Sequence, residues 1–214
     1  MVVLVLLVIL LMQSAISYST TFGRLDSLTT DMRRGLSTGW LVFRGVVILV
    51  IIALWFLNRK KGLFKAIIFV NAMLTIGLML NMLALSDILV GLTSQAAKVL
   101  LVEVFFMAVT NILIFSIWYW IIDPPGVEEI LRMDEPWDFL FPQREGNLPF
   151  YETWLPQYTD YLYLAFTNSF AFSPTDVLPL TRRAKMLMLL QSVISIVTLT
   201  GIAGSAINLL AGGS

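Results

Sequence analysis

The chain has 214 residues, of which 58% are hydrophobic and only 13% are charged. A soluble domain of this length cannot bury so much apolar surface, so the composition excludes that class and predicts an integral membrane protein. The 14 basic residues balance the 14 acidic ones, so net charge gives no reason to expect nucleic acid as a partner. Because the chain has no Cys and no His, it forms no disulfides, and we expect no metal site, no cofactor and no His-based catalysis.

Five apolar segments approach the roughly 20 residues that an α-helix needs to cross a bilayer. They predict an all-α fold with five transmembrane helices, and a further short helix precedes the last span. The first segment contains a small-residue stretch that resembles a signal-peptide cleavage site, but no basic residue precedes it, so we interpret it as a span. The predicted spans are Val2–Tyr18, Trp40–Leu57, Leu63–Leu85, Val99–Ile122 and Met186–Leu210.

The turn Asn58–Gly62 between the second and third spans is strongly basic, with Arg59, Lys60 and Lys61. Basic loops face the cytoplasm, so we expect this turn to lie there. Five alternating spans then put the N-terminus and residues 123–185 on the same side. We expect the protein in the plasma (inner) membrane of a bacterium, with a cytoplasmic N-terminus.

Polar side chains form one strip in the third span and one in the fourth, each at helical spacing. Polar groups are costly in lipid and usually face the interior of a helix bundle, so we expect the two strips to face each other. One interpretation is hydrogen bonding between helices, and the other is an ion or proton site at the single acidic residue. The strips are Asn71, Thr75 and Asn81, and Glu103, Thr110 and Asn111.

Residues 123–159 differ in character from the four spans before them, which make up a first region, residues 1–122. The segment opens with Asp123-Pro124-Pro125-Gly126, which ends a helix, and continues with acidic and aromatic residues. It is either an interfacial segment, with a short amphipathic helix around Val127–Arg132, or an ordinary loop outside the membrane.

Residues 160–214 form the third predicted region, and they begin with an apolar helix, Asp160–Phe172, that is too short to cross a bilayer. We predict a re-entrant or interfacial helix, a polar turn and then the terminal span. The side chains that would line a pore or build the turn are Thr167, Ser169, Phe172, Ser173, Pro174, Thr175 and Asp176.

The terminal span contains Gly201, Gly204 and Ser205. Small residues four apart allow close contact between helices, whereas two glycines also weaken the helix locally. This stretch is therefore either a packing face or a bending point.

The order of short helix, turn, proline, basic residues and long helix is similar to that of the pore module of tetrameric potassium channels. Asp176-Val177-Leu178-Pro179 resembles the Asp-x-x-Pro that follows their selectivity filter. Ala171-Phe172-Ser173-Pro174-Thr175 then occupies the place of Thr-Val-Gly-Tyr-Gly and lacks both glycines, which allow the backbone conformations of the filter. The resemblance implies a homo-tetramer but gives no support for potassium selectivity.

By overall plan, Asp160–Gly212 also resembles the end of a family of bacterial multi-span membrane proteins to which no activity is assigned. The resemblance lies in Asp160–Thr167, a Phe-Ser-x-Thr-Asp-like turn, an Arg-rich patch and the ending Ile207-Asn208-Leu209-Leu210.

Two functions follow as hypotheses. The first is a channel-like homo-oligomer that passes cations, with Asp176 at its mouth and Ser169, Ser173 and Thr175 offering oxygens. The second is a non-conducting scaffold or accessory subunit that binds partner membrane subunits. In both cases the lipid bilayer is the surrounding partner. We do not expect an enzyme, because Glu103 has no second acidic residue to act with.

Overall fold

The computed structural model of the chain describes residues 1–12, 46, 48–49, 53, 60–88, 94–124, 136–144, 149–151, 154–171 and 176–212. Most of the predicted span Trp40–Leu57, residues 13–18 of Val2–Tyr18 and the predicted helix around Val127–Arg132 lie outside these residues.

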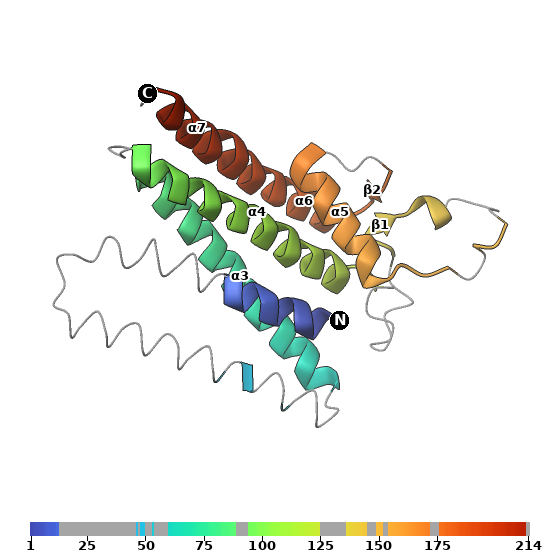
Figure 1. Cartoon of the computed structure of the whole chain (residues 1–214). Coiled ribbons are helices and arrows are strands. Elements are labelled where there is room, and N and C mark those ends of the chain that lie inside the picture. The colour runs from blue at the N-terminus through green and yellow to red at the C-terminus, as the bar shows by residue number, and fades with distance from the viewer. Residues whose placement is uncertain are drawn as a thin grey trace.

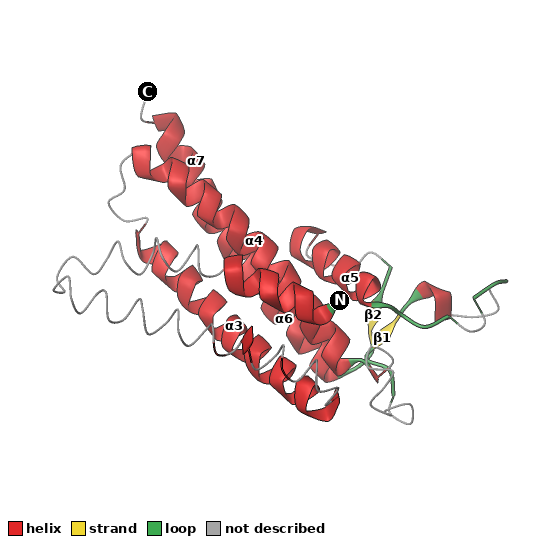
Figure 2. Ribbon diagram, turned by 60° about the horizontal axis from the view of Figure 1, so that its bottom comes forward, coloured by secondary structure: helices red, strands yellow, loops and turns green. Residues whose placement is uncertain are grey.

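The described chain is mostly helical (Figures 1 and 2). A short apolar helix, Val2–Met12, comes first. Two longer helices follow along the chain, α3 (Lys60–Ile88) and α4 (Ser94–Ile122), and after them comes the 14-residue α5 (Tyr158–Ala171). The last helical stretch consists of α6 (Arg182–Ser195), the π-helix η4 (Ile196–Ile202) and α7 (Ala203–Gly212). Short elements lie between α4 and α6: β1 (Phe139–Leu140), the 3₁₀ turn η3 (Pro142–Arg144) and β2 (Leu178–Pro179).

Three helical stretches are long and apolar enough to cross a membrane. They are Lys61–Leu83, Leu100–Ile122 and Arg182–Ser205, which agree closely with three of the predicted spans. These stretches indicate a membrane-associated protein. Val2–Met12 is shorter than a bilayer requires, and the described residues add no fourth stretch of sufficient length.

The helix α4 lies at the centre of the bundle, because α3, α5 and the α6–η4–α7 stretch all pack against it (Figure 1). Its side chains Met107, Ile114 and Phe115 are fully buried. Leu6 and Ile9 of the N-terminal helix are fully buried as well, so this helix contributes to the same core.

The beginnings of α3 and α6 both lie at the C-terminal end of α4. The Phe64 ring of α3 contacts the Trp120 ring with 6.3 Å between centroids. The Arg183 Nη2 of α6 donates a hydrogen bond to the Ile122 carbonyl at 3.4 Å. Lys61 and Arg182, which are both exposed, therefore belong to one end of the bundle, which we call the basic end.

The short helix predicted at Asp160–Phe172 is present as α5, and its 14 residues extend for roughly 21 Å. The described chain is mostly helical, as expected, but a short two-stranded antiparallel pair, with β1 before α5 and β2 after it, was not predicted. Phe139 pairs with Pro179 and Leu140 pairs with Leu178. This pair joins the chain after α5 to the chain after α4, at the basic end.

The predicted packing face at Gly201, Gly204 and Ser205 is exposed, and a Cβ atom added at either glycine would meet nothing within 4 Å. Ser205 Oγ donates to the Gly201 carbonyl at 2.8 Å, within the same helix. Gly201 also belongs to η4, where the helix widens to π geometry. Gly201, Gly204 and Ser205 therefore lie on an exposed side of the helix, where the helix geometry changes, whereas Ile202 between them is buried.

Candidate functional site

Six buried polar side chains hold α5 against α4 and α6, and we call them the polar core. None of the six is more than 2% exposed. Polar groups inside a membrane bundle are costly unless they are hydrogen-bonded, so their presence together requires an internal network. The members are Asn111 and Tyr119 of α4, Asn168 and Ser169 of α5, and Gln191 and Ser195 of α6.

The side-chain amide of Gln191 lies at the centre of the polar core. Its Nε2 donates to the Ala165 carbonyl and to Ser169 Oγ, each at 2.8 Å. Its Oε1 accepts from Asn168 Nδ2 at 2.9 Å and from the Tyr119 hydroxyl. Both donors of this amide and its acceptor oxygen are thus used, which fixes the distance and rotation of α5 relative to α6.

Asn111 and Asn168 extend the network in opposite directions. Asn111 Nδ2 donates to Ser195 Oγ at 2.8 Å and to Ser169 Oγ at 3.5 Å. Asn168 Nδ2 also donates to the Met188 carbonyl at 3.1 Å. Asn111 Oδ1 is buried, and among the residues that the structure describes it has no hydrogen-bond partner, so one acceptor at this edge of the network is not satisfied there.

The strip predicted on the third span does contact α4, where Thr75 Oγ1 accepts from Trp118 Nε1 at 2.9 Å, but Asn111 of the fourth-span strip faces away from α3. Asn71 Nδ2 also reaches α4, where it donates to the Ile114 carbonyl at 3.2 Å. Asn111, in contrast, points to α5 and α6, because α4 is surrounded by helices and neighbouring positions on it face different ones. Asn81 is buried on α3 and Glu103 is half-buried on α4, and neither belongs to the polar core.

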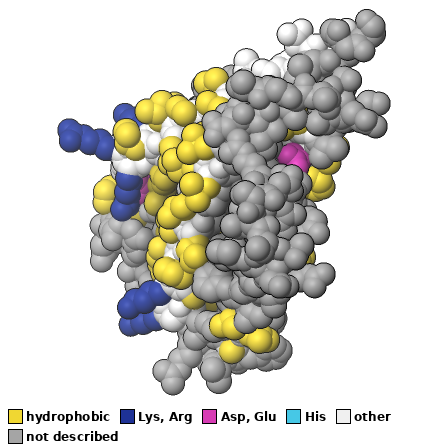
Figure 3. All heavy atoms as spheres, turned by 90° about the vertical axis from the view of Figure 1, so that its left-hand side faces the viewer, with side chains coloured by type: hydrophobic (Ala, Val, Ile, Leu, Met, Phe, Trp, Pro, Cys, Tyr) yellow, Lys and Arg dark blue, Asp and Glu magenta, His cyan; other side chains and the backbone are white. Residues whose placement is uncertain are grey.

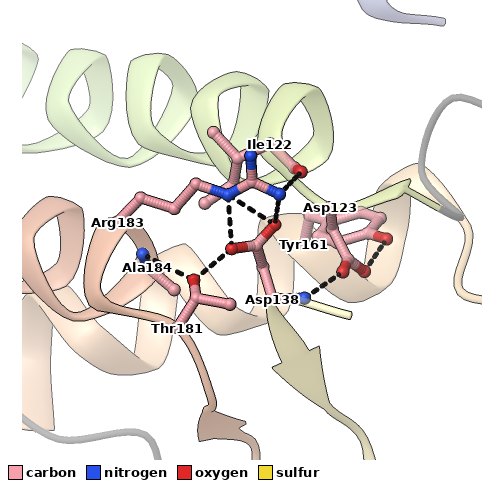
Figure 4. A network of polar contacts seen from close by, with 7 residues as sticks. All are labelled: Ile122, Asp123, Asp138, Tyr161, Thr181, Arg183 and Ala184. Carbon is pink, nitrogen blue, oxygen red and sulfur yellow. Dashed lines mark hydrogen bonds and ion pairs between the residues drawn. The ribbon is translucent and has the colours of Figure 1, made fainter. Parts of the chain in front are cut away.

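A second cluster lies at the basic end, around the buried carboxyl groups of Asp123 and Asp138 (Figure 4). Asp123 directly follows α4 and accepts from the Tyr161 hydroxyl at 2.6 Å and from the Asp138 backbone N–H at 2.9 Å. One carboxyl group therefore joins the end of α4 to α5 and to the strand β1. We call this group and the Asp138 contacts the carboxylate cluster.

Asp138 is fully buried and forms a two-pronged ion pair with Arg183. Arg183 Nη2 lies 2.6 Å from Oδ2, and Nε lies 2.7 Å from Oδ1. The Thr181 hydroxyl donates to the same carboxylate while its oxygen accepts from the Ala184 N–H, so Thr181 also caps the start of α6. The Asp138 carbonyl also accepts from the Leu180 N–H at 2.8 Å. Asp138 therefore holds Leu180, Thr181 and Arg183, where the chain enters α6.

Burial raises the pKa of Asp123 above the ordinary value of 3.8, although the hydrogen bonds from Tyr161 and Asp138 and the charge of Arg144 oppose the rise. Arg144 is itself half-buried, and burial lowers its pKa. Its guanidinium lies 4.1 Å from the Trp137 ring centroid, a cation–π contact. At the basic end, the ionisable side chains of Asp123 and Arg144 are therefore shielded from water where α4, α5 and β1 meet.

The residues that the sequence predicted to line a pore do not lie together in one site. Ser169 belongs to the polar core, whereas Thr167 Oγ1 donates within its own helix, to the carbonyls of Tyr163 and Leu164 at 3.1 and 3.0 Å. Asp176 is exposed beyond α5. Phe172, Ser173, Pro174 and Thr175 lie outside the described residues.

Several residues of both clusters were not found from the sequence. Gln191 and Ser195 stand four residues apart inside a predicted span, and that spacing of polar side chains was a usable signal. Asp138 and Arg183 gave no local signal, because 45 residues separate them.

The fold and the two clusters define a membrane-associated helical bundle that holds one short helix by internal hydrogen bonds. No family model, curated protein or solved structure matches the chain. Among the described residues, no group of three or more Asp or Glu side chains is arranged to hold a metal ion.

Replacement of Arg183 by Gln would leave the buried Asp138 carboxylate without its ion partner. Losing one member of a buried pair typically costs 3–5 kcal/mol, and because Arg183 is 45% exposed we expect about 3 kcal/mol here. Denaturant unfolding in detergent measures this loss. Arg182→Gln is the matched control, since Arg182 is exposed on the same turn, and its effect should stay within about 0.5 kcal/mol. Equal effects of the two substitutions would contradict the role given to the ion pair.

Because the pKa of Asp123 is raised in the folded protein, we expect the stability of the protein to depend on pH. Between the ordinary and the raised pKa, the folded protein binds more protons than the unfolded chain, so the free energy of unfolding falls as pH rises through this interval. Asp123→Asn cannot ionise and should lack this part of the slope. Unfolding measured at a series of pH values upward from 3.8 tests the difference, and identical slopes for the two proteins would refute it.

Proposed function

We propose that the protein is a non-conducting integral membrane protein that serves as a scaffold or accessory subunit of a larger membrane complex. The observation that carries this proposal is the burial of Asn168 and Ser169, each 2% exposed and bonded to α4 or α6. A pore requires polar groups that face water. The polar side chains of α5 are instead used within the chain, which favours a structural role for this helix.

The proposed topology has five spans, with α5 entering the membrane only partway. Support comes from the two ends of the α5 segment, since Tyr161 near its start and Thr181 after its return both contact the carboxylate cluster. Lys61, Lys65 and Lys185 are exposed at the same end of the bundle. The excess of basic residues there favours a cytoplasmic location for this end, in the inner membrane of a bacterium.

The outer face of α5 supports binding to partner membrane subunits. Tyr163, Phe166 and Phe170 are about half exposed, at 50%, 52% and 49%, and their spacing puts them on one side of the helix. The rings of Phe166 and Phe170 lie 4.9 Å apart. A rigid aromatic face opposite a fixed polar face is suited to contact with a partner helix.

The channel-like homo-oligomer is the second candidate, because a short helix that starts and returns at one end of a bundle is also the plan of a re-entrant pore helix. In that arrangement the exposed Asp176 would lie near the axis of a tetramer. The turn before Asp176 would have to supply the pore lining, since Ser169 is enclosed by α4 and α6.

Reconstitution into lipid vesicles tests the two candidates. We expect cation flux no greater than that of protein-free vesicles, both for the wild type and for Asp176→Asn. Addition of a cation ionophore at the end of each trace confirms that the vesicles are sealed. Flux in the wild type that falls in Asp176→Asn would reject the scaffold proposal and favour the channel.

A further inference from the structure

One exposed face of α6 changes from basic to apolar along its length. Arg182 and Lys185 are exposed in its first turn, and exposed apolar side chains follow on the same side at helical spacing. From residue 182 to residue 196 this face extends for roughly 21 Å, which exceeds half of a ~30 Å hydrocarbon core. The apolar members on α6 and their exposure are Met186 at 63%, Leu189 at 57% and Val193 at 47%, and Ile196 at the start of η4 continues the face at 46%.

The positive charge on the first turn of α6 is only partly neutralised by the residues that the structure describes. Three of its residues are basic and none is acidic. Asp138 neutralises Arg183, whereas Arg182 and Lys185 have no acidic partner among the residues that the structure describes. Figure 3 shows basic side chains along one edge of a band of hydrophobic side chains. A ligand for the α6 face therefore needs a negative group at one end and an apolar remainder.

The turn is also held in place before any ligand arrives. Thr181 caps α6, and the Arg183–Asp138 ion pair fixes the turn to the carboxylate cluster. A preorganised backbone reduces the entropy lost on binding. Arg182 supplies a planar fork that matches two phosphate oxygens, and Lys185 adds a point charge three residues further along.

We propose that this face of α6 binds one anionic phospholipid. Arg182 and Lys185 hold the phosphate of the headgroup, and an acyl chain lies along Met186, Leu189 and Val193. The proposal goes beyond the scaffold function, which requires a membrane but no particular lipid. It commits to a lipid and not to free phosphate, because the basic pair continues directly into an exposed apolar face.

The start of α3 provides a matched comparison. Lys61 and Lys65 are exposed at the basic end and are followed by exposed Phe69 and Ile76. This pair carries the same charge but has no guanidinium fork, and no acidic side chain among the described residues forms an ion pair with it. Replacing Lys61 and Lys65 therefore measures how much positive charge alone contributes to lipid affinity, without a preorganised binding site.

The test uses the full-length protein in a neutral detergent, titrated with dioleoyl phosphatidylglycerol and followed by native mass spectrometry of bound lipid. Each basic residue near an anionic headgroup contributes roughly a fivefold factor in affinity, so Arg182→Gln with Lys185→Gln should weaken binding about 25-fold. Lys61→Gln with Lys65→Gln should have a clearly smaller effect. Dioleoyl phosphatidylcholine should bind the wild type weakly.

Three results would overturn the proposal: unchanged phosphatidylglycerol binding in the α6 variant, an equal loss in the α3 variant, or equal affinity for phosphatidylcholine. Thermal unfolding of each variant without added lipid shows whether it is folded. The variant Arg182→Lys with Lys185→Arg keeps both positive charges and should retain most of the lipid binding. This result would show that the double Gln variant loses binding because it lacks the charges, and not because it is misfolded.

Discussion

The Gln191 amide is the interaction on which the arrangement of the bundle depends. Its two donors and its acceptor oxygen are used by Ala165, Ser169, Asn168 and Tyr119, and the side chain is fully buried. Any rotation of α5 about its axis would strand these groups in an apolar environment, where each unpaired one costs about 1–3 kcal/mol. The polar side of α5 is therefore committed to the interior, and its aromatic side is left for the surroundings.

The carboxylate cluster fixes the start of α5 and the place to which the chain returns after this helix. Asp123 connects the end of α4 with Tyr161 of α5, and Asp138 connects β1 with Thr181 and Arg183 at the start of α6. Because Asp123 also accepts from the Asp138 N–H, the two carboxyl groups form one junction. The polar core sets how α5 is rotated, whereas the carboxylate cluster sets where its segment begins and returns.

The sequence predicted the long apolar helices and the extent of α5 well, because apolar length and helix-ending residues are local properties. Leu63–Leu85 and Val99–Ile122 were expected, and α3 and α4 contain them. The roles of the polar residues were predicted less well from the sequence. Ser169 was assigned to a pore or turn, yet it bonds to Gln191. The Asp138–Arg183 pair and the strands β1 and β2 join distant segments, which periodicity does not reveal.

The most direct test of this account is the water accessibility of position 169. The chain contains no Cys, so Ser169→Cys carries a single thiol, and Asp176→Cys provides an exposed reference. The rate of modification by a charged, water-soluble methanethiosulfonate is measured in lipid vesicles. Because Ser169 is buried in the polar core, we expect Ser169→Cys to react far more slowly than Asp176→Cys. Comparable rates at the two positions would contradict it, because α5 would then present its polar side to water.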